Sequence, residues 1–172
     1  MNELDELLEV VDDSNQVVGK ATRGECYRKG LLHRAVNIFI YNSKNDVFLH
    51  QRSSKKLKYP LFWDLSCSEH VKSGESFTEA AKRGLKEELG IEVQLQEIIP
   101  IHKIDSSAGK YLDYELVVTY KGIYEGKMKF DPNEVAKGKY FNTDELDKLI
   151  SNGKIKVTSW FLKDWKLLNN LH

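Results

Sequence analysis

The sequence predicts an α+β fold in which helices pack on a mixed β-sheet. Two observations support this fold class. Short segments with alternating or β-branched residues recur through the chain, and helical spacing is confined to three separate segments. The chain has 172 residues, 41 % of them apolar, and it contains no repeat or Pro/Gly-rich linker. We therefore expect a single domain over residues 1–172.

An N-terminal β-hairpin is expected over about residues 6–22, because two apolar stretches flank a polar turn at residues 12–15. Four later segments have the alternation or β-branching of strands. They span residues 35–41, 47–52, 91–104 and 112–120. In the last of them Asp113 and Glu115 are two positions apart, so both carboxylates are expected on one face of the strand.

Three helices are expected, each preceded by residues that suit an N-cap. The first covers residues 77–89, where Ser76 is the cap and Glu79 completes a capping box. Its apolar side chains recur every four residues and predict one buried stripe. The second helix covers residues 144–150, and the third follows residues 158–159.

The charge balance and the cysteine content narrow the cellular setting. Acidic and basic residues number 26 each, so no excess of positive charge favours nucleic-acid binding. No apolar run approaches the ~20 residues that span a bilayer, and the acidic N-terminus does not resemble a signal peptide. Two cysteines are too few for a disulfide framework. We expect a cytoplasmic monomer or homodimer that binds neither nucleic acid nor membranes.

The segment over residues 69–91 carries the strongest functional signal. A glycine turn leads into the first helix, and Glu75, Glu87 and Glu88 lie around that helix. A few carboxylates held in this way bind Mg²⁺ or Mn²⁺, and such an ion can bridge the oxygens of a diphosphate. The alternative is a solvated ion-pair face between Arg83 and Glu87, which would be worth less than ~0.5 kcal/mol.

This segment resembles the Nudix box, whose pattern is G-x5-E-x7-R-E-U-x-E-E-x-G-U, with U aliphatic. The matching residues are Glu75, Arg83, Leu85, Glu87, Glu88, Gly90 and Ile91. The resemblance implies a Nudix fold, with the mixed sheet sandwiched between helices, and metal bound by the three glutamates. Two positions depart from the pattern. Glu69 replaces the first glycine, and Gly84 replaces a glutamate that binds metal or activates water in many of the family's hydrolases. Gly84 serves either close packing of the helix on the sheet or a reaction whose water is activated from elsewhere.

About residues 8–165 resemble one Nudix branch, the isopentenyl diphosphate isomerase-like proteins. The stretches LLHRAVNIFIYN, FLHQRSSKK and YPLFWDLS carry this resemblance. It places the isomerases' acid–base cysteine at Ser68, and a hydroxyl is a far weaker acid than a thiol of pKa ~8.5. Cys67, the neighbouring residue, is expected to point to the opposite side and to be a small buried residue.

The same resemblance implies a second metal site. Its ligand positions fall on Cys26, His33, His70, Asp113 and Glu115. Two histidines, two carboxylates and a cysteine suit Zn²⁺ or Mn²⁺. The alternative is a hydrogen-bonded core histidine at position 33 and an exposed strand face at positions 113 and 115. Glu115 is also a candidate general base.

The resemblance further implies residues that bind the diphosphate. Arg52 and Lys56 match phosphate-binding positions of the branch, and Arg and Lys suit phosphate oxygens. Arg83 and Trp63 are further candidates, although Trp63 could instead pack beneath the loop. Lys58 is expected to lie in a solvated basic loop.

Three functions are compatible with these residues. The leading one is divalent-metal-dependent hydrolysis of a small organic or nucleoside diphosphate by water attack on phosphorus. The alternative is isopentenyl diphosphate isomerase activity, which moves protons at an allylic carbon. The third is a non-catalytic module, and in each case the expected partner is a small-molecule diphosphate. The candidate catalytic residues are Ser68, Glu87, Glu88 and Glu115.

Overall fold

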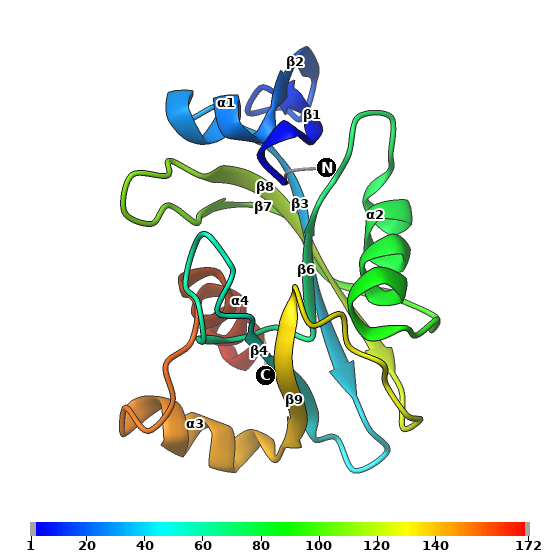
Figure 1. Cartoon of the computed structure of the whole chain (residues 1–172). Coiled ribbons are helices and arrows are strands. Elements are labelled where there is room, and N and C mark those ends of the chain that lie inside the picture. Colours follow the sequence, from blue (N-terminus) through cyan, green and yellow to red (C-terminus); the bar gives the residue numbers. More distant parts are fainter. Residues whose placement is uncertain (1–2, 171–172) are drawn as a thin grey trace.

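The computed structural model describes residues 3–170, which form one nine-stranded mixed sheet with helices on both faces (Figure 1). The strands are β1 (Leu7–Val11), β2 (Val17–Thr22), β3 (His33–Tyr41), β4 (Val47–Arg52), β5 (Trp63–Asp64), β6 (Cys67–His70), β7 (Gln96–Asp105), β8 (Tyr114–Ile123) and β9 (Val135–Phe141). The helices are η1 (Glu3–Asp5), α1 (Arg23–Lys29), α2 (Phe77–Gly84), η2 (Leu85–Leu89), α3 (Thr143–Ser151) and α4 (Ser159–Asn170). The expected α+β class and the N-terminal hairpin are confirmed.

The sheet is organised around β3. This strand pairs antiparallel with β1, β4 and β6 and parallel with β8. Its apolar side chains alternate between two cores: Val36 and Ile38 pack on the α2 side, and Ala35 and Phe39 pack on the α4 side. A strand covered on both faces has a nearly continuous apolar sequence, as AVNIFIY does.

Helices cover the two faces of the sheet unequally. In Figure 1, α2 lies along one face, whereas α3 and α4 lie on the other. The stripe predicted for the first helix is present, because Ala81, Leu85 and Leu89 are all fully buried in the first core. On the opposite face, Phe161 and Trp165 of α4 stack with ring centroids 5.7 Å apart and fill the second core.

Several elements differ from those expected. The helix predicted over residues 77–89 is α2 followed by the π-helical turn η2, which ends at Gly90 in the left-handed conformation. Helix α1 was not predicted, although Thr22 and Glu25 form a capping box at its start. Strand β9 was also not predicted, and β7 begins only at residue 96. Among the described residues, no helix is long and apolar enough to cross a membrane.

Candidate functional site

Strand β6 divides the site between the two faces of the sheet. Cys67 packs in the core beneath α2, whereas Ser68 donates a hydrogen bond to Asn37 Oδ1, 2.9 Å away, on the opposite side. Glu69 returns to the α2 side, and His70 faces the same side as Ser68. The expected burial of Cys67 and its orientation opposite to Ser68 are both confirmed.

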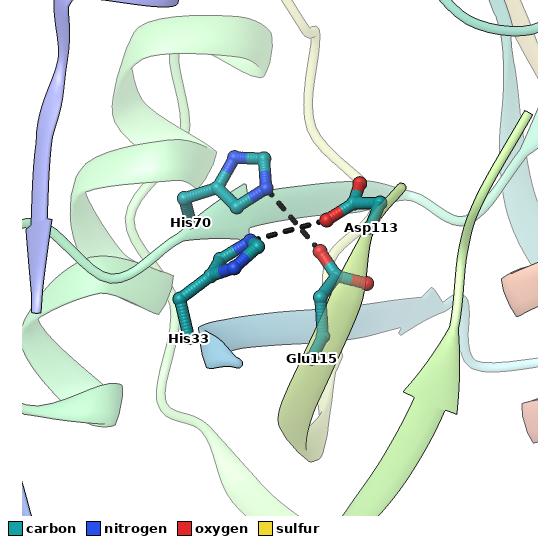
Figure 2. A group of neighbouring side chains, drawn as sticks. All are labelled: His33, His70, Asp113 and Glu115. Atoms are coloured by element: carbon teal, nitrogen blue, oxygen red, sulfur yellow. Dashed lines mark ion pairs between the residues drawn. The ribbon is translucent and has the colours of Figure 1, made fainter. Parts of the chain in front are cut away.

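Four of the five predicted ligands of the second metal site come together (Figure 2). His33 begins β3, His70 ends β6, Asp113 directly precedes β8, and Glu115 lies in β8. One ligand atom of each lies within 4.8 Å of those of the others, and all four side chains are buried. His33 meets Glu115 because β3 and β8 pair in parallel with these residues opposite each other. We refer to these residues as the quartet.

Three buried donor atoms of the quartet have no hydrogen-bond partner among the residues that the structure describes. His33 Nε2 lies 3.1 Å from Asp113 Oδ1, and His70 Nε2 lies 3.3 Å from Glu115 Oε1. Both nitrogens and Asp113 Oδ1 are nevertheless buried without a hydrogen bond, since the contacts do not have hydrogen-bond geometry. Buried polar atoms in proteins are nearly always satisfied. This donor set of two imidazoles and two carboxylates fits a divalent transition metal such as Zn²⁺ or Mn²⁺.

Positive charge in the quartet comes from a proton and from a lysine. Burial disfavours the charged form of His33, but contact with Asp113 outweighs burial and raises the pKa of His33 to about 10. Burial likewise opposes ionisation of Asp113, but His33 and Lys58 hold the pKa of Asp113 below its usual range. Protonated His33 and the Lys58 ammonium therefore supply the charge that a divalent cation would otherwise supply.

The other half of the quartet contains a carboxyl group suited to proton transfer. Burial and the nearby Asp113 carboxylate raise the pKa of Glu115 to about 7. Burial also lowers the pKa of His70 well below its usual value. Ser106 Oγ donates a hydrogen bond of 2.5 Å to Glu115 Oε2 and fixes the carboxyl group. A group that titrates near neutrality can both give and accept a proton, so Glu115 suits an acid–base role.

Lys58 is not the solvated residue that its sequence context indicated. Only 6 % of it is exposed, and its ammonium forms an ion pair with Asp113. The same ammonium lies 5.0 Å from the ring centroid of Tyr27 and 4.9 Å from that of Trp160. These partners come from α1 and α4, so nothing near position 58 in the sequence could have revealed them. Lys58 and Trp160 are therefore site residues that sequence reasoning missed.

Arg83 organises the carboxylates on the α2 side of β6. Each of its five N–H groups donates a hydrogen bond. The acceptors are the carboxylates of Glu69, Glu75 and Glu87 and the backbone carbonyl of His70. No N–H group remains for a phosphate oxygen. These hydrogen bonds give Arg83 a positioning role, and substrate binding by Arg83 stays a prediction.

The three glutamates predicted to bind metal lie in different environments. Glu75 accepts hydrogen bonds from Arg83 and from the backbone N–H of Lys72. Glu87 is exposed and pairs with Arg83 at 3.2 Å. Glu88 is only 4 % exposed, and its Oε2 is buried with no hydrogen-bond partner within residues 3–170. Both Glu87 and Glu88 lie in η2, and π-helical turns are frequent at functional sites.

A cavity of about 180 Å³ connects the two sides of β6 and suits a small ligand. Its lining contains most of the predicted site, namely Arg52, Lys56, Ser68, His70, Arg83, Glu87, Glu88 and Glu115. Arg52 pairs with Asp64 at 2.8 Å, and Lys56 pairs with Glu134 at 2.7 Å, so both cations are held in place. Seven carboxylate and six cationic side chains line the cavity. A diphosphate therefore meets a mixed surface in which a divalent cation would offset the carboxylates.

Two predicted site residues lie elsewhere. Trp63 packs edge-to-face on Phe141, with centroids 5.0 Å apart, and it does not line the cavity. Trp63 thus packs against β9 and the second core. Cys26 lies beside His33 but outside the quartet. Helix α1 buries Cys26 in a small apolar cluster with Leu8, and ligation by its thiol stays a prediction.

The sandwiched mixed sheet, together with a glutamate-bearing helix beside the cavity, defines the class of protein. A family model for the NUDIX domain matches residues 31–161. The chain therefore belongs to the Nudix family. Solved structures agree on the fold. DR0079 from Deinococcus radiodurans has a TM-score of 0.77 and 24 % identity, over 96 % of this chain and 98 % of its own. A MutT protein from Methanosarcina mazei Go1 has a TM-score of 0.63 and 18 % identity, over 78 % of this chain and 89 % of its own.

Curated relatives define the branch within the family. The chain is 31 % identical to the isopentenyl-diphosphate Delta-isomerase of Serratia proteamaculans (strain 568), over 92 % of this chain and 89 % of the relative. It is 34 % identical to isopentenyl-diphosphate Delta-isomerase 1 of Bos taurus, over 97 % of this chain and 87 % of the relative. The chain is thus similar to the isomerase branch along nearly its whole length.

Proposed function

We propose that this protein moves a double bond in a small isoprenoid-type diphosphate by proton transfer. This is the reaction given by the name of its relatives, isopentenyl-diphosphate Delta-isomerase. The observation that carries this proposal is the quartet. It brings residues from β3, β6 and β8 to one buried point beside the cavity. Hydrolysis, which the sequence placed first, does not call for such a centre in addition to the carboxylates around Arg83.

Glu115 is the residue proposed to transfer the proton. It lies in the cavity wall, and its pKa of about 7 allows it to add or remove a proton at a substrate carbon near neutral pH. A divalent cation in the quartet would supply positive charge that favours the Glu115 carboxylate. Arg52, Lys56 and Lys58 lie in the same wall and offer donors to the diphosphate.

Ser68 stands where the branch has its acid–base thiol, and it faces the same side of β6 as Glu115. Its hydroxyl donates to Asn37, whose Nδ2 in turn donates to Asp164 at 2.8 Å. A serine hydroxyl is a weak acid, so the second proton transfer should be slow. We therefore expect an isomerase with a low rate.

The second candidate is metal-dependent hydrolysis of a small diphosphate. It is favoured because Ser68 lacks the acid–base thiol of the isomerases, and because the carboxylates of Glu87 and Glu88 line the same cavity. In that reaction water attacks phosphorus, and the carbon skeleton keeps its hydrogens.

One experiment separates the two candidates. The purified protein is incubated with Mg²⁺, Zn²⁺ and isopentenyl diphosphate in D₂O, and NMR follows the allylic positions while phosphate and diphosphate release are assayed. We expect deuterium at the allylic carbons and a shifted double bond, with no phosphate release. Phosphate release without deuterium incorporation would replace the first candidate by the second. Ligand binding without either change would indicate a non-catalytic module.

A further inference from the structure

The two departures from the Nudix box are in contact with each other. A Cβ atom built on Gly84 would lie 2.4 Å from Glu69 Cγ and 2.9 Å from Cys67 Sγ. The backbone at this position is ordinary right-handed helix, with φ of −57° and ψ of −47°, so glycine is not required by conformation. It is required because the Glu69 side chain occupies the space that a side chain at position 84 would fill.

The exchange keeps a carboxylate in this space. The family pattern has glycine on the strand and glutamate on the helix, and this chain has the reverse, Glu69 on β6 and Gly84 at the end of α2. The Glu69 carboxylate accepts a hydrogen bond from Arg83 Nη1 at 2.9 Å and lines the cavity. It thus enters the carboxylate cluster from the strand instead of from the helix.

A second observation, an unsatisfied oxygen of Glu88, points to a ligand at this cluster. Glu88 lies beside Glu69 and lines the same cavity. It is 4 % exposed, and its Oε2 atom is buried with no hydrogen-bond partner among the described residues. Two neighbouring carboxylates, one of them almost completely buried, repel each other unless a cation or a proton lies between them. Arg83 satisfies Glu69 but does not donate to Glu88.

We propose that Glu69 and Glu88 together bind a divalent cation between β6 and η2, so that Glu69 replaces the missing glutamate of the box as a metal ligand. The ion is Mg²⁺ or Mn²⁺, since both ligands are carboxylate oxygens. This site is separate from the quartet, which lies on the other face of β6. The inference rests on the proposed function in one respect, namely that the substrate is a diphosphate that the ion would face. It applies equally to isomerisation and to hydrolysis.

The test uses Mn²⁺ binding without any substrate. Mn²⁺ is titrated into metal-free protein and followed by electron paramagnetic resonance, with wild type compared with Glu69→Gln, Glu88→Gln and His33→Gln. We expect two Mn²⁺ sites in wild type. Glu69→Gln and Glu88→Gln should each weaken the same site at least tenfold, and His33→Gln should weaken only the other one. Glu97→Gln, an exposed charge-matched change on β7, should bind as wild type does.

Glu69→Gln keeps an oxygen acceptor for Arg83, so a merely structural role would leave Mn²⁺ affinity unchanged. Wild-type affinity in Glu69→Gln would overturn the proposal. The reciprocal double variant Glu69→Gly/Gly84→Glu restores the usual box and should bind Mn²⁺ as wild type does. Gly84→Glu alone should unfold at a lower temperature than both wild type and the double variant. An equally stable Gly84→Glu would overturn the claim that Glu69 fills this space. Neither readout depends on turnover, so failure of the proposed reaction leaves this test intact.

Discussion

The quartet and the carboxylates around Arg83 lie on opposite sides of β6, and they stabilise buried charge in different ways. In the Arg83 cluster one guanidinium donates five hydrogen bonds, so most of its carboxylates have partners without any ion. In the quartet the Nε2 atoms of both histidines and Asp113 Oδ1 have no hydrogen-bond partner among the described residues. The Arg83 cluster is thus a preformed scaffold with one member, Glu88, that has an unsatisfied oxygen among the described residues, whereas three of the four quartet side chains have such atoms.

The largest effect is expected from placing a thiol on the quartet side of β6. Ser68→Cys introduces an acid of pKa ~8.5 into the cavity that Glu115 also lines, and general acid–base catalysis contributes ~10²-fold or more. We expect deuterium exchange into isopentenyl diphosphate to accelerate by about that factor. The matched control is Cys67→Ala, on the α2 side, which should leave exchange unchanged. The reverse pattern would show that the chemistry takes place on the α2 face.

The next largest effect is the gain in stability when the quartet binds an ion. Zn²⁺ at about 100 times its dissociation constant should raise the free energy of unfolding by ~2.7 kcal/mol, because the folded state binds it and the unfolded chain does not. His33→Gln should lose this stabilisation. Urea unfolding with Zn²⁺ and with a chelator measures it. His102→Gln, a histidine outside the quartet, should retain the full increment, and equal responses in the two variants would argue against the site.

Arg83→Lys tests the preformed scaffold. A lysine cannot reproduce the five fixed donors, so several partly buried carboxylates lose charged hydrogen bonds. We expect the free energy of unfolding to fall by ~2 kcal/mol, the order of one strong hydrogen bond to a charged group. Chemical denaturation in the absence of metal measures this loss. Lys82→Arg, at an exposed neighbouring position, should change stability very little.

The smallest effect is expected for the pair of His102 and Asp164, in which both ring nitrogens of the histidine have hydrogen-bond partners. His102 Nε2 lies 2.8 Å from Asp164 Oδ1. Burial opposes the charged form, but the hydrogen bond to Asp164 outweighs burial and raises the pKa of His102. Its stabilisation is therefore fully present below the unfolded-state pKa of ~6.5 and is lost as pH rises through the higher folded-state pKa.

The size of this contribution should stay below ~1 kcal/mol because the pair is partly exposed. Unfolding of wild type and His102→Gln at pH 5.5 and pH 8.5 measures it, as the difference between the two proteins. Wild type should exceed the variant in stability mainly at the lower pH. A gap that is the same at both values would mean that His102 stays neutral in the folded protein.

The sequence identified the Arg83 cluster because its residues are contiguous. Glu75, Arg83, Glu87 and Glu88 lie within one turn and one helix, so spacing alone brought them together. The same reasoning could not show that Arg83 uses every N–H group on protein acceptors, because two of its partners, Glu69 and His70, belong to β6. It also could not show that Glu69 and Gly84 fill one space, since that contact joins a strand to a helix.

The quartet shows the opposite relation between sequence and structure. Family resemblance, not spacing, named its residues, and 82 positions separate His33 from Glu115. Their contact depends on the parallel register of β3 with β8. Helix α1, which local patterns did not reveal to us, then decided that Cys26 lies outside the group.

By itself, the sequence determined the α+β class, the capped helix, the burial of its apolar stripe and the presence of serine at position 68, because these depend on local periodicity and on residue identity. Only the tertiary structure decided that Lys58 is buried against Asp113, that Trp63 packs on Phe141, and that three buried atoms of the quartet have no hydrogen-bond partner among the described residues. The physical reason is that burial, pairing and unsatisfied atoms belong to contacts between distant segments, which no single segment specifies.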